Sequence, residues 1–361
     1  MRVLHVLRGD YATHVGGDLV QLRATTKALS DQGVGVETAT MAEAQDRPDI
    51  VHLYNLQRPR PLADDVALAR GRWPGARLVI SPVFWPWEPR ALLGVVDPAV
   101  WWRAAKSSAK ARSRWLMCRR LLGQADAVLP NSLGEGERVR RYFALPSGPR
   151  WTAVPNGLWI DQWPMRTDID RQATLAGFGL DPSVETLVAC VGRVEPQKNQ
   201  RALVEAVAAQ PTIGLLLVGP WDTTRYGLAV HERVERDLPR RAACTGVLSQ
   251  PDIARLLAGV DVHVLPSFRE TPGLASLEAA AVGCEIVVTP GGSTLEYFGP
   301  DAHVAGSGRA SSIAEAIDDA IRRPRQPDLR GRVEGYDWSR AALVLRDVYA
   351  SVLAGPPATA T

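Results

Sequence analysis

The stretch ETLVACVGRVEPQKNQRALVEAVAAQ, residues 185–210, decides the fold expected for this chain of 361 residues. It opens with an apolar run, continues through a polar turn that contains a glycine, and ends with alanine, leucine and valine at helical spacing. Such a pattern predicts a buried strand over 185–193 and a helix over 199–210. Buried strands that alternate with helices form a parallel sheet covered on both faces, so the stretch predicts an α/β domain.

The same alternation extends over most of the chain. The strands expected before this stretch occupy residues 3–7, 34–40, 49–55, 77–84 and 125–132. Those expected after it occupy residues 213–220, 261–267 and 285–290. A chain of 361 residues exceeds one ordinary hydrophobic core, so the sequence predicts two doubly wound, Rossmann-like domains.

The domain boundaries follow from the segments that interrupt this pattern. Residues 151–164 are rich in proline, glycine and tryptophan, which is typical of a linker. We therefore expect an N-terminal domain over 1–155 and a C-terminal domain over 156–337. The helix expected over 338–355 has no obvious place in the second sheet, and we expect it to pack back on the first domain. The tail, 356–361, is predicted to be disordered.

Composition and charge narrow the class of protein. The chain is 46% hydrophobic and 22% charged, which is typical of a globular protein in water, and a net charge of +3 is too small to predict a nucleic-acid partner. No signal peptide opens the sequence and no apolar stretch approaches the length of a membrane span. We expect a location in the cytoplasm or at the inner face of the cell membrane. Four cysteines without metal-ligand spacing fit a reducing compartment: Cys118, Cys190, Cys244 and Cys284.

Two motifs at expected strand ends are suited to an anion. In HVGGDL, Gly16 and Gly17 precede a helix, where bare backbone and unpaired amides can approach a negatively charged ligand. In VGRVEPQKNQ, Arg193 follows the buried strand and Lys198 lies five residues further on, which suits a diphosphate. Taken alone, the glycine motif is explained more simply by a structural turn, and an exposed turn is the alternative for the second motif.

A third motif, SFRETPGLASLEAAAVG over 267–283, places two carboxylates around a helix start. We expect Thr271 to cap a helix whose first residue is Pro272, with Glu270 just ahead of it. Glu278 lies about two turns into that helix, among apolar residues, where a carboxylate needs a partner. Carboxylates accept hydrogen bonds from vicinal hydroxyls, as in sugars and riboses. The simpler alternative is two unrelated surface acids.

Taken together, the motifs indicate a known family. The segments GRVEPQK, PNG, TGVLSQPDIARLLAGVDVHVLPS and SFRETPGLASLEAAAVG resemble, in order and spacing, the donor-binding half of the retaining GT-B glycosyltransferases of family GT4. Glu270 and Glu278 match the family's E-x7-E signature. The resemblance covers nearly the whole chain and is strongest over 150–300. It implies a GT-B fold, with two Rossmann-like doubly wound domains facing across a cleft.

The resemblance also implies an activity and roles for the matching residues. The protein would be a hexosyltransferase that moves a sugar from a nucleoside diphosphate sugar to a hydroxyl acceptor, with retention of configuration, in the assembly of a polysaccharide, glycolipid or other glycoconjugate. Arg193 and Lys198 would hold the diphosphate. Glu270 would accept from the transferred sugar and Glu278 from the ribose, and backbone near Leu248 would line the base.

Further expectations concern backbone contacts and cofactors. Gly16 and Gly17 would approach the diphosphate and the acceptor. Pro272 removes one amide that the family usually offers the sugar, leaving those of Gly273 and Leu274. No cofactor or metal is implied, and the sequence has no Asp-x-Asp cluster, so arginine, lysine and a helix start would supply the positive field.

One departure concerns the first domain. Family members commonly carry a histidine past the fourth strand, where this chain reads VISPVFWPWEP. Either Phe84 or Trp85 takes over its positioning role or catalysis is impaired. Three alternatives therefore stay open: an inverting transferase with His14 as its base, a sugar-nucleotide epimerase, and an inactive sugar-nucleotide-binding partner subunit.

The acceptor is the least determined partner, whether a glycan, a lipid-linked molecule or a small molecule. Segment 101–120 carries seven cations, three tryptophans and no acid. This pattern suits an anionic membrane surface or a lipid-linked pyrophosphate. A solvated basic helix with its tryptophans turned into the core fits equally well.

Overall fold

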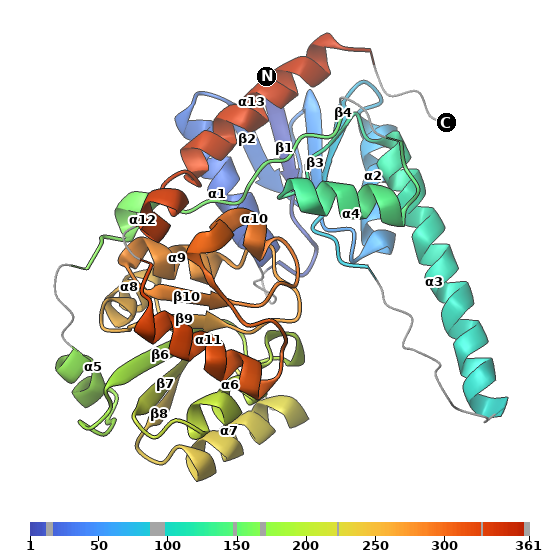
Figure 1. The fold of residues 1–361 in the computed structure, drawn as a ribbon. Helices are drawn as coiled ribbons and strands as arrows, with labels where there is room; N and C mark the ends of the chain where they lie inside the picture. The colour runs from blue at the N-terminus through green and yellow to red at the C-terminus, as the bar shows by residue number, and fades with distance from the viewer. Residues whose placement is uncertain are drawn as a thin grey trace. The chain divides into compact units, whose positions relative to one another are not determined.

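The computed structural model describes residues 1–11, 17–86, 98–146, 150–166, 171–221, 224–325 and 328–356, without the side chains of 98–108 and 328. The chain forms two compact units (Figure 1). Unit 1 comprises Met1–Asn156 together with Trp338–Thr361, and unit 2 comprises Gly157–Asp337. Each unit is built on one sheet of parallel strands.

Unit 1 contains a five-stranded sheet in the order β2-β1-β3-β4-β5. The strands are β1 (Arg2–Val6), β2 (Gly35–Ala39), β3 (Ile50–Tyr54), β4 (Arg77–Ser81) and β5 (Ala127–Val128). The helices are α1 (Gly17–Asp31), α2 (Pro59–Arg72), α3 (Pro98–Gln124), α4 (Leu133–Tyr142) and α13 (Trp338–Ala354). All five residues of β3 are buried, because a central parallel strand is covered on both faces.

Helix α13 packs against α1, so the last helix of the chain completes the first unit (Figure 1). Its Tyr349 is fully buried and joins a cluster of polar side chains on β1 and β3. The Tyr349 hydroxyl is hydrogen-bonded to His5 Nε2 at 3.1 Å and to His52 Nδ1 at 2.7 Å. Burial lowers the pKa of His5 to about 3, so the imidazole stays neutral at physiological pH.

Unit 2 contains a six-stranded sheet in the order β11-β10-β9-β6-β7-β8. The strands are β6 (Thr186–Val191), β7 (Ile213–Val218), β8 (Ala242–Gly246), β9 (Val262–Leu265), β10 (Glu285–Val288) and β11 (His303–Val304). The order of the strands reverses between β6 and β9. Ligands of doubly wound sheets bind beyond the carboxyl ends of the strands at such a switch point.

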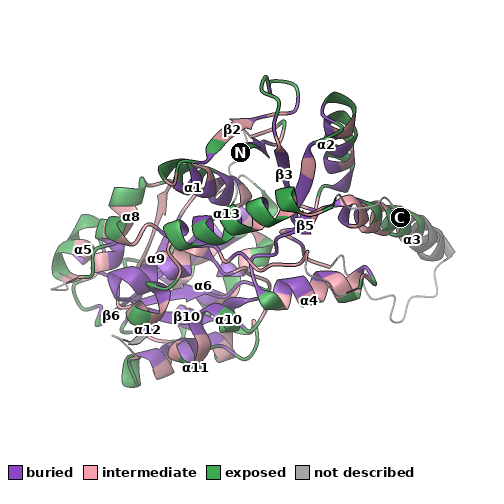
Figure 2. Cartoon of the chain, turned by 90° about the horizontal axis from the view of Figure 1, so that it is seen from above, coloured by how far each residue is buried: buried purple, intermediate pink, exposed green. Residues whose placement is uncertain are grey.

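The helices of unit 2 cover both faces of this sheet. They are α5 (Arg171–Gly177), α6 (Gln200–Ala208), α7 (Arg225–Asp237), α8 (Gln250–Ala258), α9 (Leu274–Val282), α10 (Thr294–Phe298), α11 (Ala310–Arg322) and α12 (Asp328–Val333), with short 3-10 turns at Ile160–Gln162, Pro196–Lys198 and Gly299–Asp301. Successive residues of β6 point to opposite faces: Leu187 packs with Leu277 of α9 in one core, and Val188 with Leu203 of α6 in the other. Figure 2 shows this layering as buried strands beneath helices with exposed outer faces.

Within the described part of the chain, no helix combines the length and the apolar character needed to cross a bilayer. Helix α3 is long enough but carries the basic residues of segment 101–120, and its exposed residues include Lys110 and Arg112.

Candidate functional site

The four charged candidates Arg193, Lys198, Glu270 and Glu278 come from loops and helices that follow β6 and β9. The loop after β6 begins at Gly192, which adopts a φ of +149°. Its carbonyl oxygen lies so close to Gly219, after β7, that a Cβ atom there would come within 2.4 Å of it. Glycine at position 219 therefore allows the two strand ends to meet.

Lys198 and Glu270 form the closest contact among these candidates. Lys198 Nζ lies 2.5 Å from Glu270 Oε2, and the two side chains are only 18% and 15% exposed. Lys198 ends a 3-10 turn, and the left-handed residue Asn199 then starts α6. Water screens this ion pair less than a pair on the surface, so the two charges attract each other more strongly.

Backbone hydrogen bonds hold the loop that carries Glu270. The amide of Glu270 donates to Gly291 O at 2.9 Å, and its carbonyl accepts from Ser293 N at 3.0 Å. Two residues earlier in the loop, Phe268 N donates to Gln197 O at 3.0 Å, which joins this loop to the one that carries Lys198. Backbone hydrogen bonds between three loops therefore hold Lys198 and Glu270 in contact.

The start of α9 differs from the expectation. The helix begins at Leu274 and its N-cap is Gly273, so the predicted capping role of Thr271 and first helical position of Pro272 are wrong. The physical reason is Gly273, whose φ of +87° breaks the helical backbone ahead of Leu274. A Cβ atom at Gly273 would lie 2.5 Å from Leu265 Cδ2, so the chain turns through a space that only glycine fits.

Glu278 lies in the middle of α9, between the buried residues Leu277 and Ala279. Its side chain is partly exposed, yet burial raises the pKa of the carboxyl to about 7. A carboxylate in this environment is stabilised by a ligand that donates hydrogen bonds to it.

The backbone of Arg193 is held by a hydrogen bond, and its guanidinium group faces solvent. Its carbonyl accepts a 2.7 Å hydrogen bond from Gln200 Nε2 at the start of α6. Its guanidinium is 53% exposed and lies 3.7 Å from Glu195 Oε2, a distance at which an exposed pair contributes little stability. The arginine is therefore available to an anionic ligand.

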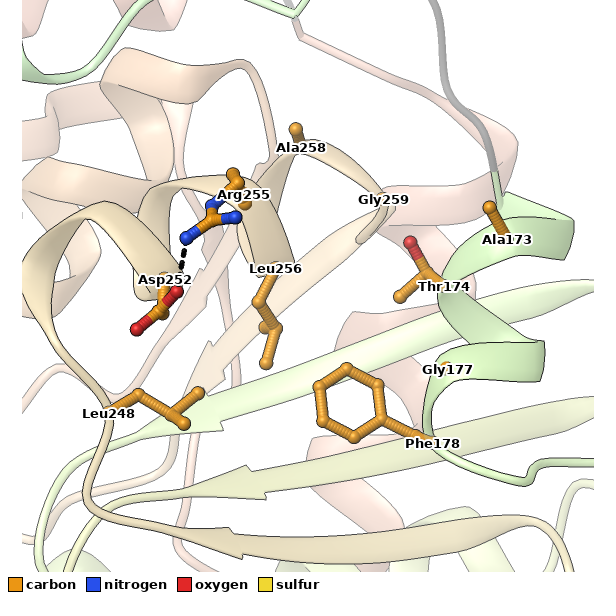
Figure 3. A pocket seen from close by; sticks show the side chains of 10 residues that line it. All are labelled: Ala173, Thr174, Gly177, Phe178, Leu248, Asp252, Arg255, Leu256, Ala258 and Gly259. Carbon is orange, nitrogen blue, oxygen red and sulfur yellow. Dashed lines mark hydrogen bonds and ion pairs between the residues drawn. The ribbon is translucent and has the colours of Figure 1, made fainter.

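Leu248 lies in a different environment from the four charged candidates. It lines a cavity of about 580 Å³ between α5 and α8, and none of the four charged candidates lines it. Figure 3 shows Leu248, Phe178 and Leu256 around the same apolar space, with the Asp252–Arg255 ion pair on α8 nearby.

The candidates of unit 1 are described only in part. Gly16 and His14 lie outside the described residues, whereas Gly17 is the exposed first residue of α1. Phe84 belongs to the core: it is 1% exposed, and its ring centroid lies 4.9 Å from that of Phe143. The expectation that Phe84 contacts a ligand therefore loses its basis.

Trp85 is partly exposed and held from two sides. Gln57 Nε2 donates to its carbonyl at 2.7 Å, and the Arg138 guanidinium lies 4.8 Å from its ring centroid. Of the two aromatic candidates in this loop, Trp85 is the one placed to meet a ligand.

Segment 101–120 lies within α3, and its described side chains show both expected behaviours. Trp115 packs against the core and donates from Nε1 to Tyr142 O at 2.7 Å, while Lys110 and Arg112 are exposed. The side chains of Trp101 and Trp102 lie outside the described residues.

Two buried polar residues were not anticipated as part of this region. Gln200 binds the carbonyl of Arg193, and His263 on β9 lies beside the end of β6. The available signal was a histidine inside the otherwise apolar run VHVL and a glutamine at a helix start.

Comparison with protein families assigns both halves of the chain. Residues 179–334 match the family described as "Glycosyl transferases group 1". Residues 7–157 match the one described as "Glycosyl transferase 4-like domain". The two matches together cover most of the chain.

Two relatives show how far this similarity extends. D-inositol 3-phosphate glycosyltransferase of Mycobacterium sp. (strain KMS) is 32% identical over 175 residues, which is 47% of this chain and 38% of that protein. The GDP-mannose-dependent alpha-(1-6)-phosphatidylinositol dimannoside mannosyltransferase of Mycobacterium tuberculosis is 31% identical over 170 residues, 45% of this chain and 42% of that one. The matched part thus spans about two fifths of either relative.

Solved structures agree with the chain over nearly its whole length. Sucrose-phosphate synthase from Thermosynechococcus elongatus has a TM-score of 0.76 at 20% identity, covering 98% of this chain and 99% of that one. Anabaena HepE, solved in complex with UDP-glucose, has a TM-score of 0.70 at 17% identity, covering 97% and 100%. These likenesses confirm the expected GT-B fold.

Proposed function

Because the chain belongs to the group 1, GT4-type glycosyltransferases, we propose that it transfers a hexose from a nucleoside diphosphate sugar to a hydroxyl acceptor. The observation that carries the proposal is the shielded Lys198–Glu270 pair at the switch point of unit 2. A cation and a carboxylate 2.5 Å apart match the junction of a diphosphate with a sugar, where negative charge and hydroxyl donors are neighbours.

The other two charged candidates would bind the parts of the donor that Lys198 and Glu270 do not reach. Arg193, with its exposed guanidinium, would neutralise the other phosphate, and Glu278 would accept hydrogen bonds from the ribose. One structural neighbour binds UDP-glucose and one relative is named GDP-mannose-dependent, which supports a nucleoside diphosphate sugar as the donor class.

The proposed reaction retains the configuration of the transferred sugar. The acceptor hydroxyl attacks on the face from which the nucleoside diphosphate departs, and the departing phosphate oxygen takes the acceptor proton. Lys198 and Arg193 stabilise the charge that develops on that phosphate, so the step needs no metal ion or resident cofactor. Glu270 would orient the sugar through its hydroxyls.

The acceptor side is proposed to involve unit 1. Trp85 presents an aromatic face at the end of β4, and aromatic faces pack against sugar rings. The exposed cations of α3, including Lys110 and Arg112, would let the protein bind an anionic membrane that carries a lipid-linked acceptor. A role in polysaccharide or glycolipid assembly follows from such an acceptor.

A thermal-shift panel of UDP-, GDP-, ADP- and dTDP-sugars tests the proposal. We expect one base to raise the melting temperature of the wild type, and the shift to be lost in Arg193→Ala and Glu278→Ala. Arg201→Ala, which removes an exposed arginine from α6, is the matched control and should keep the shift. A panel without any shift would refute the proposed donor site.

One observation favours a second candidate, an inactive sugar-nucleotide-binding subunit. Where the family commonly has a histidine, this chain buries Phe84 and stacks Trp85 against Arg138. Release of nucleotide from a bound donor in the presence of acceptor extracts separates the two functions. Donor binding without any release would favour the inactive subunit.

A further inference from the structure

A buried histidine lies where the sheet of unit 2 divides. The ladder between β6 and β9 ends at Ala189 and His263, whereas β6 stays paired with β7 as far as Val191. Beyond Ala189, β6 and β9 separate, which is the opening that a switch point provides. The imidazole of His263 lies in this opening and is fully buried.

Both ring nitrogens of His263 have a partner. The amide of Val191 donates to Nε2 over 3.4 Å, and Nδ1 lies 3.5 Å from the hydroxyl of Ser276 in the first turn of α9. Because Nε2 accepts, Nδ1 carries the proton and donates to Ser276. Burial lowers the pKa of His263 to about 3, with a further contribution from the Lys198 ammonium, so the ring is neutral.

An apolar side chain of similar size would occupy the same space as His263 but could form neither hydrogen bond. It would leave a strand amide and a hydroxyl buried without partners, which is unfavourable. The presence of a histidine at position 263 is therefore explained by its two hydrogen-bond partners. Val191 directly precedes Gly192 and Arg193, and Ser276 follows the Gly273 turn, so one ring connects the loop of the cations with the start of α9.

We propose that His263 is a positioning residue, which holds the Arg193 loop and the first turn of α9 at the separation that a nucleoside diphosphate requires. This inference rests on the proposed donor site. His263 itself touches no reacting atom; it acts through the amide of Val191 and the hydroxyl of Ser276.

Four variants separate the two connections. His263→Gln keeps an acceptor for the Val191 amide, His263→Asn keeps a donor for Ser276, and His263→Phe keeps only volume. Ser276→Ala removes the second connection from the other side. His303→Gln is the matched control, because His303 is an equally buried histidine of unit 2 that binds Glu285 and Asp319 instead.

The first readout is donor binding, measured as KM for the sugar nucleotide and by calorimetry with the nucleoside diphosphate alone. We expect His263→Phe to raise KM and Kd about tenfold or more, and to lower kcat as well, because the displaced Arg193 also stabilises the charge that develops on the departing phosphate. His263→Gln should recover most of this loss. His303→Gln should lower the melting temperature without changing KM. Unchanged affinity in His263→Phe would overturn the inference.

The second readout needs no ligand. Hydrogen exchange of the free protein should accelerate in His263→Phe at 192–199 and at 270–276 together, and not in the rest of unit 2. Acceleration spread evenly over unit 2, or confined to one segment, would also overturn the inference. If the wild type binds no nucleoside diphosphate, the donor site fails, while this measurement still decides whether His263 couples the two loops.

Discussion

The loops after β6 and β9 of unit 2 differ in chemistry from the loop after β4 of unit 1. In unit 2 the loops after β6 and β9 carry charges, and backbone hydrogen bonds fix them, as between Glu270 and Gly291. In unit 1 the loop after β4 carries aromatic rings, and a buried carboxylate fixes it: Glu135 Oε1 accepts from Phe84 N at 2.8 Å. Under the proposed function, the charged loops of unit 2 suit an anion, whereas Trp85 in the loop after β4 suits a sugar ring.

The largest effect is expected from removing the charge of Lys198 in the loop after β6. Lys198→Ala leaves the Glu270 carboxylate shielded and without its ammonium, and removes positive charge from the departing phosphate. We expect kcat/KM to fall by roughly 10²–10³-fold, measured as nucleotide release. Lys27→Ala, which removes an exposed lysine of α1, is the control and should retain full activity.

In the loop after β4, removal of the buried ring should lower the stability of the protein, whereas removal of Lys198 should lower its activity. Phe84→Ala is expected to cost about 3–5 kcal/mol of unfolding free energy, because a fully buried ring is removed from the core of unit 1. Trp85→Ala should leave stability nearly unchanged and raise KM for the acceptor. Urea unfolding and acceptor kinetics of both variants check this contrast, and equal loss of stability in the two would contradict it.

A smaller effect is expected at the turn ahead of α9. Gly273→Ala places a methyl group against Leu265 at a left-handed position, which should cost about 1–3 kcal/mol. Gly177→Ala in α5 is the control, since a Cβ atom there meets nothing within 4 Å. Equal melting temperatures for the two variants would show that the turn relaxes.

The smallest effect concerns pH. Burial raises the pKa of Glu278 from 4.5 to about 7, so the folded protein binds more protons than the unfolded chain between these values. Its contribution to stability therefore falls as pH rises from about 4.5 to about 7 and is constant above. Donor affinity should rise over the upper part of this range, as the carboxylate forms, and Glu278→Gln should abolish that rise. Calorimetry at about pH 6 and about pH 8 decides it.

The sequence predicted the fold because its signals are local. The run 185–193 contains β6, the helix predicted after it contains α6, and the spacing of Glu270 and Glu278 places one in a loop and the other in α9. These features depend on apolar periodicity and on residues close in the chain, which a single sequence displays.

What could not be predicted depends on contacts between distant residues. Phe84 and Trp85 are neighbours in sequence, yet Glu135 and Phe143 turn one into the core while Gln57 and Arg138 hold the other outside. No spacing rule carries that information.

The prediction of the start of α9 was wrong, and the role of the buried histidine was not anticipated, for related reasons. Thr271 and Pro272 carry an ordinary helix-start pattern, which the backbone of Gly273 overrides. His263 lies in an apolar strand, and its importance depends on where β6 and β9 separate, which only the assembled sheet defines.

The position of α13 has a consequence for synthesis of the protein. Domains of a growing chain generally fold as units in the order in which they emerge. Here unit 2 is continuous, Gly157–Asp337, whereas unit 1 needs its final helix. His5 and His52 precede unit 2 in the chain, whereas their hydrogen-bond partner Tyr349 follows it. Unit 2 can therefore fold once its own residues have emerged, whereas the cover of the sheet in unit 1 waits until α13, which follows unit 2 in the chain, has also been synthesised.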